Sequence, residues 1–232
     1  ITGGDSSGAI FEAHGPDSGT IEFGDERIVY SGLEPITDTT LATTRTLGFN
    51  DNPQTITIRD DGDPNNNMIV IDSTEAEFVT MDISALTSII INGGSADDVI
   101  LVDSLDNGFT ASLTINGGGG NDRITVGSSL TLGAGSIDLT AETIEVNGSI
   151  SAKDVTLTAV ASDTTQVTTA GGVVDRMAGI SIGSGITATG SISVNASVVR
   201  DIDLGNSLVD LVLGAGTAIR SEASVAVGDG AQ

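Results

Sequence analysis

Two glycine-rich stretches place an acid where it could bind a cation. The chain reads GGSADDVIL at residues 93–101 and GGGGNDRIT at residues 117–125. Asp98 and Asp122 occupy the same place in the two stretches, 24 positions apart (122 − 98). Carboxylate oxygens are the ligands that Ca²⁺ prefers in proteins. We therefore predict a calcium site at these two acids, with the preceding oxygen-bearing side chains, Asp97 and Asn121, beside them.

A second acidic cluster lies in the segment RDDGDPNNN. Asp60 or Asp61, then Asp63 and Asn65, supply oxygen atoms at alternate positions, as calcium-binding loops do. The segment has no distant Glu to complete an EF-hand loop, and Asp-Gly and Asp-Pro pairs also form ordinary turns. The sequence predicts either a second cation site or a solvated hairpin turn.

The charge balance bears on possible partners. Eight basic residues stand against 32 acidic ones, which gives a formal net charge of −24 and a pI near 4.1. Binding to nucleic acid requires Lys and Arg, so we expect no nucleic-acid partner. No apolar run approaches the roughly 18 residues of a membrane span, so we expect no membrane insertion. The acidity favours cation binding, although it also serves the solubility of a secreted protein.

The elements that must position these acids are predicted to be β-strands. Short alternating runs bounded by Gly, Asn, Asp or Ser recur along the chain, and none of the segments suggests a helix longer than two turns. The phrases SIIINGG at Ser88 and SLTINGG at Ser112 are again 24 positions apart. Repeats of about this length indicate a solenoid. We predict an all-β protein dominated by a parallel β-helix with coils of about 20–25 residues.

The same spacing predicts how the acids are placed. In a parallel β-helix each residue lies about 5 Å from its equivalent in the next coil, so Asp98 would stack under Asp122. Two carboxylates at that separation repel each other unless a cation or a proton intervenes. Residues 88–232 are expected to form the β-helix, and residues 1–87 an irregular acidic β-region that could be continuous with it.

The glycine loops resemble a known calcium-binding repeat. Residues 117–125 fit the pattern G-G-x-G-x-D-x-U-x, where U is a large apolar residue, and so resemble the nonapeptide of the RTX (repeat-in-toxin) family. The resemblance implies that Asp122 binds Ca²⁺ and that Ile124 enters the core. In residues 93–101, Ala96 replaces the third fixed glycine. The two copies are not in tandem, so at most one or two isolated calcium sites are expected.

The later part of the chain resembles a second family. The rhythm of residues 135–161, GSIDLTAETIEVNGSISAKDVTLTAVA, is similar to the haemagglutinin-like repeats of secreted bacterial adhesins related to filamentous haemagglutinin. This resemblance implies an extracellular or cell-surface location and a place within a longer chain. The partners it implies are copies of the chain, neighbouring modules of the same giant protein, or a surface glycan or other host or cell-surface ligand.

Three functions follow from these observations. The first is an extracellular, non-enzymatic structural or adhesive module stabilised by calcium. The second is a subunit that assembles end to end into a filament or surface layer through β-pairing, because uncapped terminal coils expose unpaired backbone groups. The third is a polysaccharide-active β-helix enzyme. His14 is the only histidine and no G-x-S-x-G surrounds a serine, so no catalytic residue is assigned.

Overall fold

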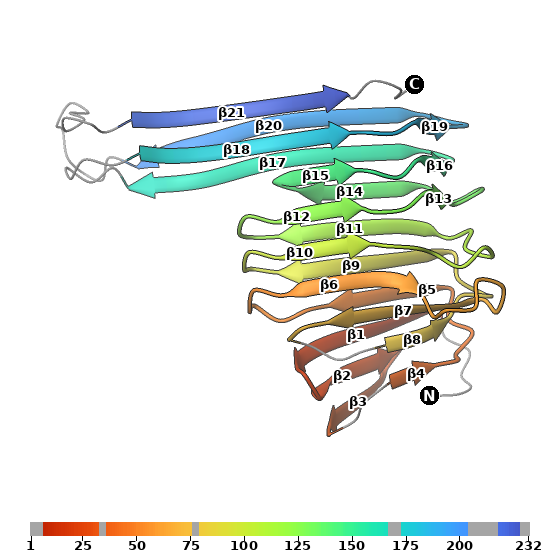
Figure 1. Ribbon diagram of the computed structural model, residues 1–232. Helices are drawn as coiled ribbons and strands as arrows, with labels where there is room; N and C mark the ends of the chain where they lie inside the picture. The colour runs from red at the N-terminus through yellow and green to blue at the C-terminus, as the bar shows by residue number, and fades with distance from the viewer. Residues whose placement is uncertain (1–6, 33–35, 76–78, 167–172, 204–217, 228–232) are drawn as a thin grey trace.

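The computed structural model is all-β. It describes residues 7–32, 36–75, 79–166, 173–203 and 218–227, and within these ranges every regular element is a strand. Figure 1 shows the strands stacked across one long axis, from β3 and β4 at one end to β20 and β21 at the other. The described residues contain no helix that is long and apolar enough to cross a membrane. The all-β class predicted from the alternating pattern is confirmed.

The strands form three sheets. In spatial order, the first sheet contains β20 (Ile192–Asp203), β17 (Val155–Gln166), β14 (Ile137–Ala141), β11 (Ser112–Gly118), β9 (Ser88–Gly94), β5 (Thr44–Gly48), β1 (Gly8–Gly15), β2 (Ser18–Phe23) and β3 (Glu26–Ser31). The second sheet contains β21 (Ala218–Val227), β18 (Val173–Ile182), β15 (Thr143–Val146), β12 (Arg123–Val126), β10 (Val99–Val102), β6 (Thr55–Asp60), β7 (Met68–Ser73), β8 (Val79–Asp82) and β4 (Ile36–Asp38). A small third sheet contains β13 (Leu130–Thr131), β16 (Ile150–Ala152) and β19 (Ile186–Ala188).

The chain alternates between the two large sheets, and most neighbouring strands are parallel. Ser88 of β9 pairs with Ser112 of β11, and Val99 of β10 pairs with Arg123 of β12. Both pairings join residues 24 positions apart, so the register expected from the repeated phrase is confirmed here. Other repeats are shorter or longer, because the loops between strands differ in length. Strand pairing therefore continues along the stack even where the repeat length changes.

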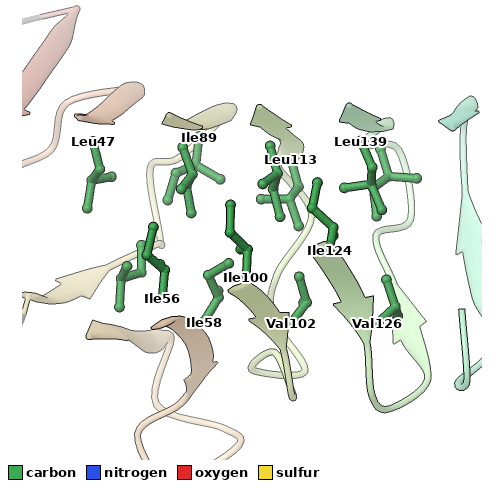
Figure 2. Close-up of a cluster of buried hydrophobic side chains, with 14 of the residues drawn as sticks. Leu47, Ile56, Ile58, Ile89, Ile100, Val102, Leu113, Ile124, Val126 and Leu139 are labelled. Carbon is green, nitrogen blue, oxygen red and sulfur yellow. The ribbon is translucent and has the colours of Figure 1, made fainter. Parts of the chain in front are cut away.

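The apolar core lies between the two large sheets. Figure 2 shows Leu47, Ile89, Leu113 and Leu139 pointing from the first sheet toward the side chains of the second sheet, which include Ile56, Ile100 and Ile124. Residues in register on successive strands, such as Ile89 with Leu113 and Ile100 with Ile124, form rows of Ile, Leu and Val that are almost completely buried. Short β-branched and Leu side chains suit this narrow core, because they pack well on a pleated surface.

The stack changes character toward its N-terminal end. β1, β2 and β3 form an antiparallel series in the first sheet, as do β6, β7 and β8 in the second. β5 and β6 nevertheless pair in parallel with β9 and β10, so both sheets continue across the predicted boundary between residues 87 and 88. Residues 1–6, including most of the glycine-rich start of the chain, lie outside the described residues.

A buried ion pair lies within this N-terminal part. Arg45 points into the core from β5, and its Nε lies 2.5 Å from Oδ2 of Asp38. Both side chains are fully buried. Arg45 also donates hydrogen bonds to the backbone carbonyls of Thr40 and Ala42 and to the Thr40 hydroxyl. These bonds compensate the guanidinium for lost hydration, which a buried charge requires.

Candidate functional site

Asp98 and Asp122 lie at one corner of the stack, immediately before strands of the second sheet. Asp98 precedes β10 and Asp122 precedes β12. Both side chains point inward, and each residue is only 1% exposed. Most acids remain in water unless they are paired, so this burial requires a local explanation. The corner residues of the neighbouring strands provide it.

One carboxylate oxygen at each position accepts a hydrogen bond from the backbone of the preceding unit. Oδ1 of Asp122 accepts the N–H of Asp98 at 2.8 Å, and Oδ1 of Asp98 accepts the N–H of Gln54 at 3.0 Å. Oε2 of Glu142 likewise accepts the N–H of Asp122 at 2.7 Å. Gln54, Asp98, Asp122 and Glu142 therefore form a continuous series, which we call the corner ladder.

The backbone geometry explains why this corner uses side chains with an oxygen acceptor. The carbonyl of each of the first three ladder residues accepts the N–H of the first strand residue in the next unit, as Asp98 does from Arg123 at 2.9 Å. The N–H of each of these three residues donates a hydrogen bond to the side chain of the next ladder residue. A buried N–H without an acceptor is costly, so the carboxylates satisfy the corner backbone.

The glycines before the acids leave room for the carboxylates. A Cβ on Gly117 would lie 2.5 Å from Cβ of Asp122 and 2.6 Å from its Oδ2. A Cβ on Gly93 would lie 2.8 Å from Oδ2 of Asp98. Real Cβ atoms do not approach other atoms so closely. Gly117 is therefore required by the inward acid of its own phrase. Gly93 is required by Asp98 and also by the backbone carbonyl of Gly117, which would lie 2.3 Å from its Cβ.

Backbone conformation accounts for three of the other glycines. Gly94, Gly118 and Gly120 have φ values of 124°, 111° and 121°, which side-chain-bearing residues rarely adopt. Ala96, at the place equivalent to Gly120, is not among the described residues with positive φ. The two loops therefore follow different paths at this position, which explains why the earlier copy departs from the glycine pattern.

The second oxygen of each acid remains without a partner. Among the described residues, Oδ2 of Asp98 and Oδ2 of Asp122 are buried and accept no hydrogen bond. Burial raises the pKa of Asp98 to about 6 despite the hydrogen bond from the Gln54 N–H, which lowers it. Burial also raises the pKa of Asp122 to about 7, and repulsion from Glu142 and Asp98 adds to the effect. Near neutral pH these groups thus favour a proton or a compensating cation.

The fit to a metal ion rests on these two oxygens. A hard cation prefers carboxylate oxygens, and the two unpartnered Oδ2 atoms belong to successive units of the stack. The described residues contain no group of three or more His, Cys, Asp or Glu side chains placed to hold one ion. Any further ligands would have to come from backbone carbonyls, amide side chains or water.

The other two predicted ligands, Asp97 and Asn121, lie on the solvent side of this corner. Asp97 and Asn121 are exposed, and Oδ1 of Asp97 accepts the backbone N–H of Asn121 at 2.7 Å. This bond also joins one unit to the next on the solvent side, but in the opposite direction to the ladder, since here the side chain of the earlier residue accepts the N–H of the later one. Asp98 and Asp122 are brought together with Glu142 inside the corner, whereas Asp97 and Asn121 form its outer rim.

The second predicted cluster forms the connection of an antiparallel pair. β6 and β7 pair across it, and Asp61, Asp63 and Asn65 are exposed. Asp61 accepts hydrogen bonds from the Asp63 N–H and the Asn66 amide, and Asp63 accepts one from the Asn65 N–H. Asp60 accepts the Gly62 N–H through Oδ1, while its Oδ2 is buried without a partner among the described residues.

Asp106 organises this second cluster from a distant part of the chain. The residue is 2% exposed, and its Oδ2 accepts the N–H groups of Asn66 and Asn67 at 3.2 and 3.1 Å. Its Oδ1 accepts the Gly108 N–H. No local sequence pattern identifies Asp106, because it lies about 40 positions from the loop to which it is hydrogen-bonded.

Two residues of the corner ladder were also missed. Glu142 follows Asp122 by 20 positions and Gln54 precedes Asp98 by 44, so neither lies at the 24-residue spacing. Their shared signal is a polar residue with a side-chain acceptor immediately before a strand of the second sheet. Comparison with known proteins yields no match, whether with a family model, a curated protein or a solved structure.

Proposed function

We propose that this chain is a parallel β-helix serving as a non-enzymatic structural or adhesive module of an extracellular bacterial surface protein. The observation that carries the proposal is the parallel pairing of successive units, from β1 to β20 in the first sheet and from β6 to β21 in the second. In such an arrangement each unit buries its apolar face only against its neighbours, which builds an extended surface from a simple sequence. The haemagglutinin-like rhythm of residues 135–161 supports the extracellular location.

The position of the conspicuous acids supports a structural rather than a catalytic use. Asp98 and Asp122 are buried and occupied by backbone N–H groups, so neither carboxylate can reach a polysaccharide in solvent. A glycoside hydrolase needs a pair of carboxyl groups flanking the scissile bond. Incubation with neutral and acidic glycans should release no products, and turnover would favour the enzyme alternative.

Calcium is part of this proposal. Asp98 and Asp122 would hold Ca²⁺ through the oxygens that lack partners, and the ion would supply positive charge where two buried carboxylates repel each other. It would also offset part of the net charge of −24. The expected consequence is a module that is more stable with calcium than without it.

Deletion of one complete unit tests the β-helix. Removal of residues 99–122 joins Asp98 to Arg123, so that Asp98 takes the place of its equivalent Asp122, 24 residues later in the chain. The shortened chain should fold and unfold cooperatively, since the strands on either side of the deletion can pair directly. The matched control removes only residues 99–110, which brings non-equivalent positions together and should prevent folding. Equal loss of folding in both variants would argue against the β-helix.

A further inference from the structure

The two ends of the stack have strands that run in the same direction. In the first sheet, all pairings from β20 to β1 are parallel, and two antiparallel steps then lead through β2 to β3. Because two reversals restore the direction, β3 runs parallel to β20. β3 and β20 are the terminal strands of this sheet among the described residues.

The second sheet has the same property. Its pairings are parallel from β21 to β6, antiparallel from β6 to β7 and from β7 to β8, and parallel from β8 to β4. β4 therefore runs parallel to β21 at the opposite end. A second copy placed on the stack by translation and rotation about its long axis would meet parallel edges in both sheets at once (Figure 1).

Exposed apolar side chains lie on these terminal strands. Ile28 and Val29 of β3 are 43% and 71% exposed, and Ile192 of β20 is 51% exposed. Natural edge strands are usually protected by Lys, Pro or bulges, because unpaired backbone groups invite another strand. The sequences of β3 (ERIVYS) and β20 (ISVNASVVRDID) contain neither Lys nor Pro, and their charged residues are confined to one end of each strand, at residues 26–27 and 200–203. Addition of a strand would cover both the edge and its apolar side chains.

From this geometry we infer that copies of the chain associate head to tail, with β3 and β4 of one copy pairing with β20 and β21 of the next. The inference rests on the proposed structural function and names its partner as a second copy. Such an interface uses different surfaces on its two sides, and because each copy is added along the long axis of the stack, it produces an open filament rather than a closed dimer. The net charge of −24 opposes the contact, and salt should promote it by screening.

Sedimentation and negative-stain electron microscopy over a range of protein and NaCl concentrations test the association. The wild-type chain should form linear multimers that lengthen with both concentrations. Ile28→Lys should raise the protein concentration needed for assembly by about tenfold or more, because it places a charge at the covered edge. Val99→Lys is the matched control, since Val99 is also 43% exposed but lies on β10 in the side of the stack. Equal effects of the two variants would overturn the inference.

Engineered cysteines test the orientation. The chain has no native cysteine, so crosslinks arise only from introduced residues. Under oxidation, Val29→Cys combined with Ile192→Cys should give a ladder of multimers, whereas either single variant should stop at dimers. A monomer at all protein and salt concentrations, or dimers alone from the double variant, would contradict head-to-tail assembly. A folded monomer that also tolerates deletion of residues 99–122 would leave the proposed structural function intact.

Discussion

Oδ1 of Asp122 accepts the backbone N–H of Asp98, one 24-residue unit earlier in the chain, at 2.8 Å. The bond joins two units that already pair through β10 and β12, and it uses an acid whose second oxygen is buried without a partner in the described part of the chain. Each carboxylate therefore has two opposing effects. It satisfies a corner N–H, and it places a charge where hydration is lost.

Substitutions at Asp122 should separate these two effects. Asp122→Ala removes the acceptor of the Asp98 N–H, and we expect it to lower the free energy of unfolding by on the order of 1–3 kcal/mol. Asp122→Asn retains an oxygen acceptor without the charge, so at pH 8 in EGTA it should be at least as stable as wild type. Urea denaturation of the three proteins measures the difference. Equal destabilisation by Ala and Asn would show that the carboxylate charge itself is required.

The raised pKa values of Asp98 and Asp122 predict a dependence of stability on pH. The folded-state pKa is about 6 for Asp98 and about 7 for Asp122, and both values lie above the ordinary value of 3.8. Between these limits the folded state binds more protons than the unfolded state, so stability should fall as pH rises from about 4 to about 7.

The pH effect should be measured by urea denaturation in EGTA. The loss is expected to be on the order of a few kcal/mol, since one pKa unit corresponds to about 1.4 kcal/mol. The double variant Asp98→Asn with Asp122→Asn is the control and should show a flatter profile. A wild-type profile that rises over this range would mean that the two carboxyl groups are ionised and favourably paired in the folded state.

The four consecutive glycines should differ in their tolerance of alanine. Gly117→Ala should be strongly destabilising, because its Cβ would meet the Asp122 side chain. Gly119→Ala should be well tolerated, because the nearest atom to its Cβ would lie 3.6 Å away, in ordinary contact. Thermal unfolding of the two variants compares them directly. Combining Gly117→Ala with Asp122→Gly should recover part of the loss, because glycine removes both the Cβ and the carboxylate that the new Cβ would meet. Strict additivity would contradict the proposed contact.

The buried ion pair of Arg45 and Asp38 should be costly to break on one side only. Arg45→Met leaves the Asp38 carboxylate buried without its cation, and we expect a loss of about 3–5 kcal/mol in the free energy of unfolding. The double variant Arg45→Met with Asp38→Asn should be less affected than the sum of the single variants. Chemical denaturation of the wild type, the two single variants and the double variant measures the coupling between the two side chains. Full additivity would indicate that the two side chains do not depend on each other.

The sequence predicted the β-class and the local register well, because both depend on nearby residues. Alternating apolar positions identify strands such as Val99–Val102, and two nearly identical phrases at equal spacing place Ser88 opposite Ser112. The stacking of Asp98 and Asp122 followed from the same spacing.

Contacts across unequal spacings could not be predicted in this way. Gln54 and Glu142 join the corner ladder over 44 and 20 positions, because the connecting loops of those units have other lengths. Asp106 bonds a loop about 40 positions away, and Arg45 appears in the sequence as one more polar residue of an alternating strand. Their roles depend on which groups the fold buries together, and a local pattern does not contain that information.

Thermal unfolding with and without calcium tests the account most directly. Wild type and the double variant Asp98→Asn with Asp122→Asn should be compared at pH 8 in 5 mM EGTA and in millimolar CaCl₂. A cation that binds only the folded state at a hundredfold excess over Kd adds about 2.7 kcal/mol, which should raise the wild-type midpoint by several degrees. We predict this rise in wild type and its loss in the double variant. An unchanged wild-type midpoint, or an equal rise in both proteins, would contradict a calcium site at these two acids.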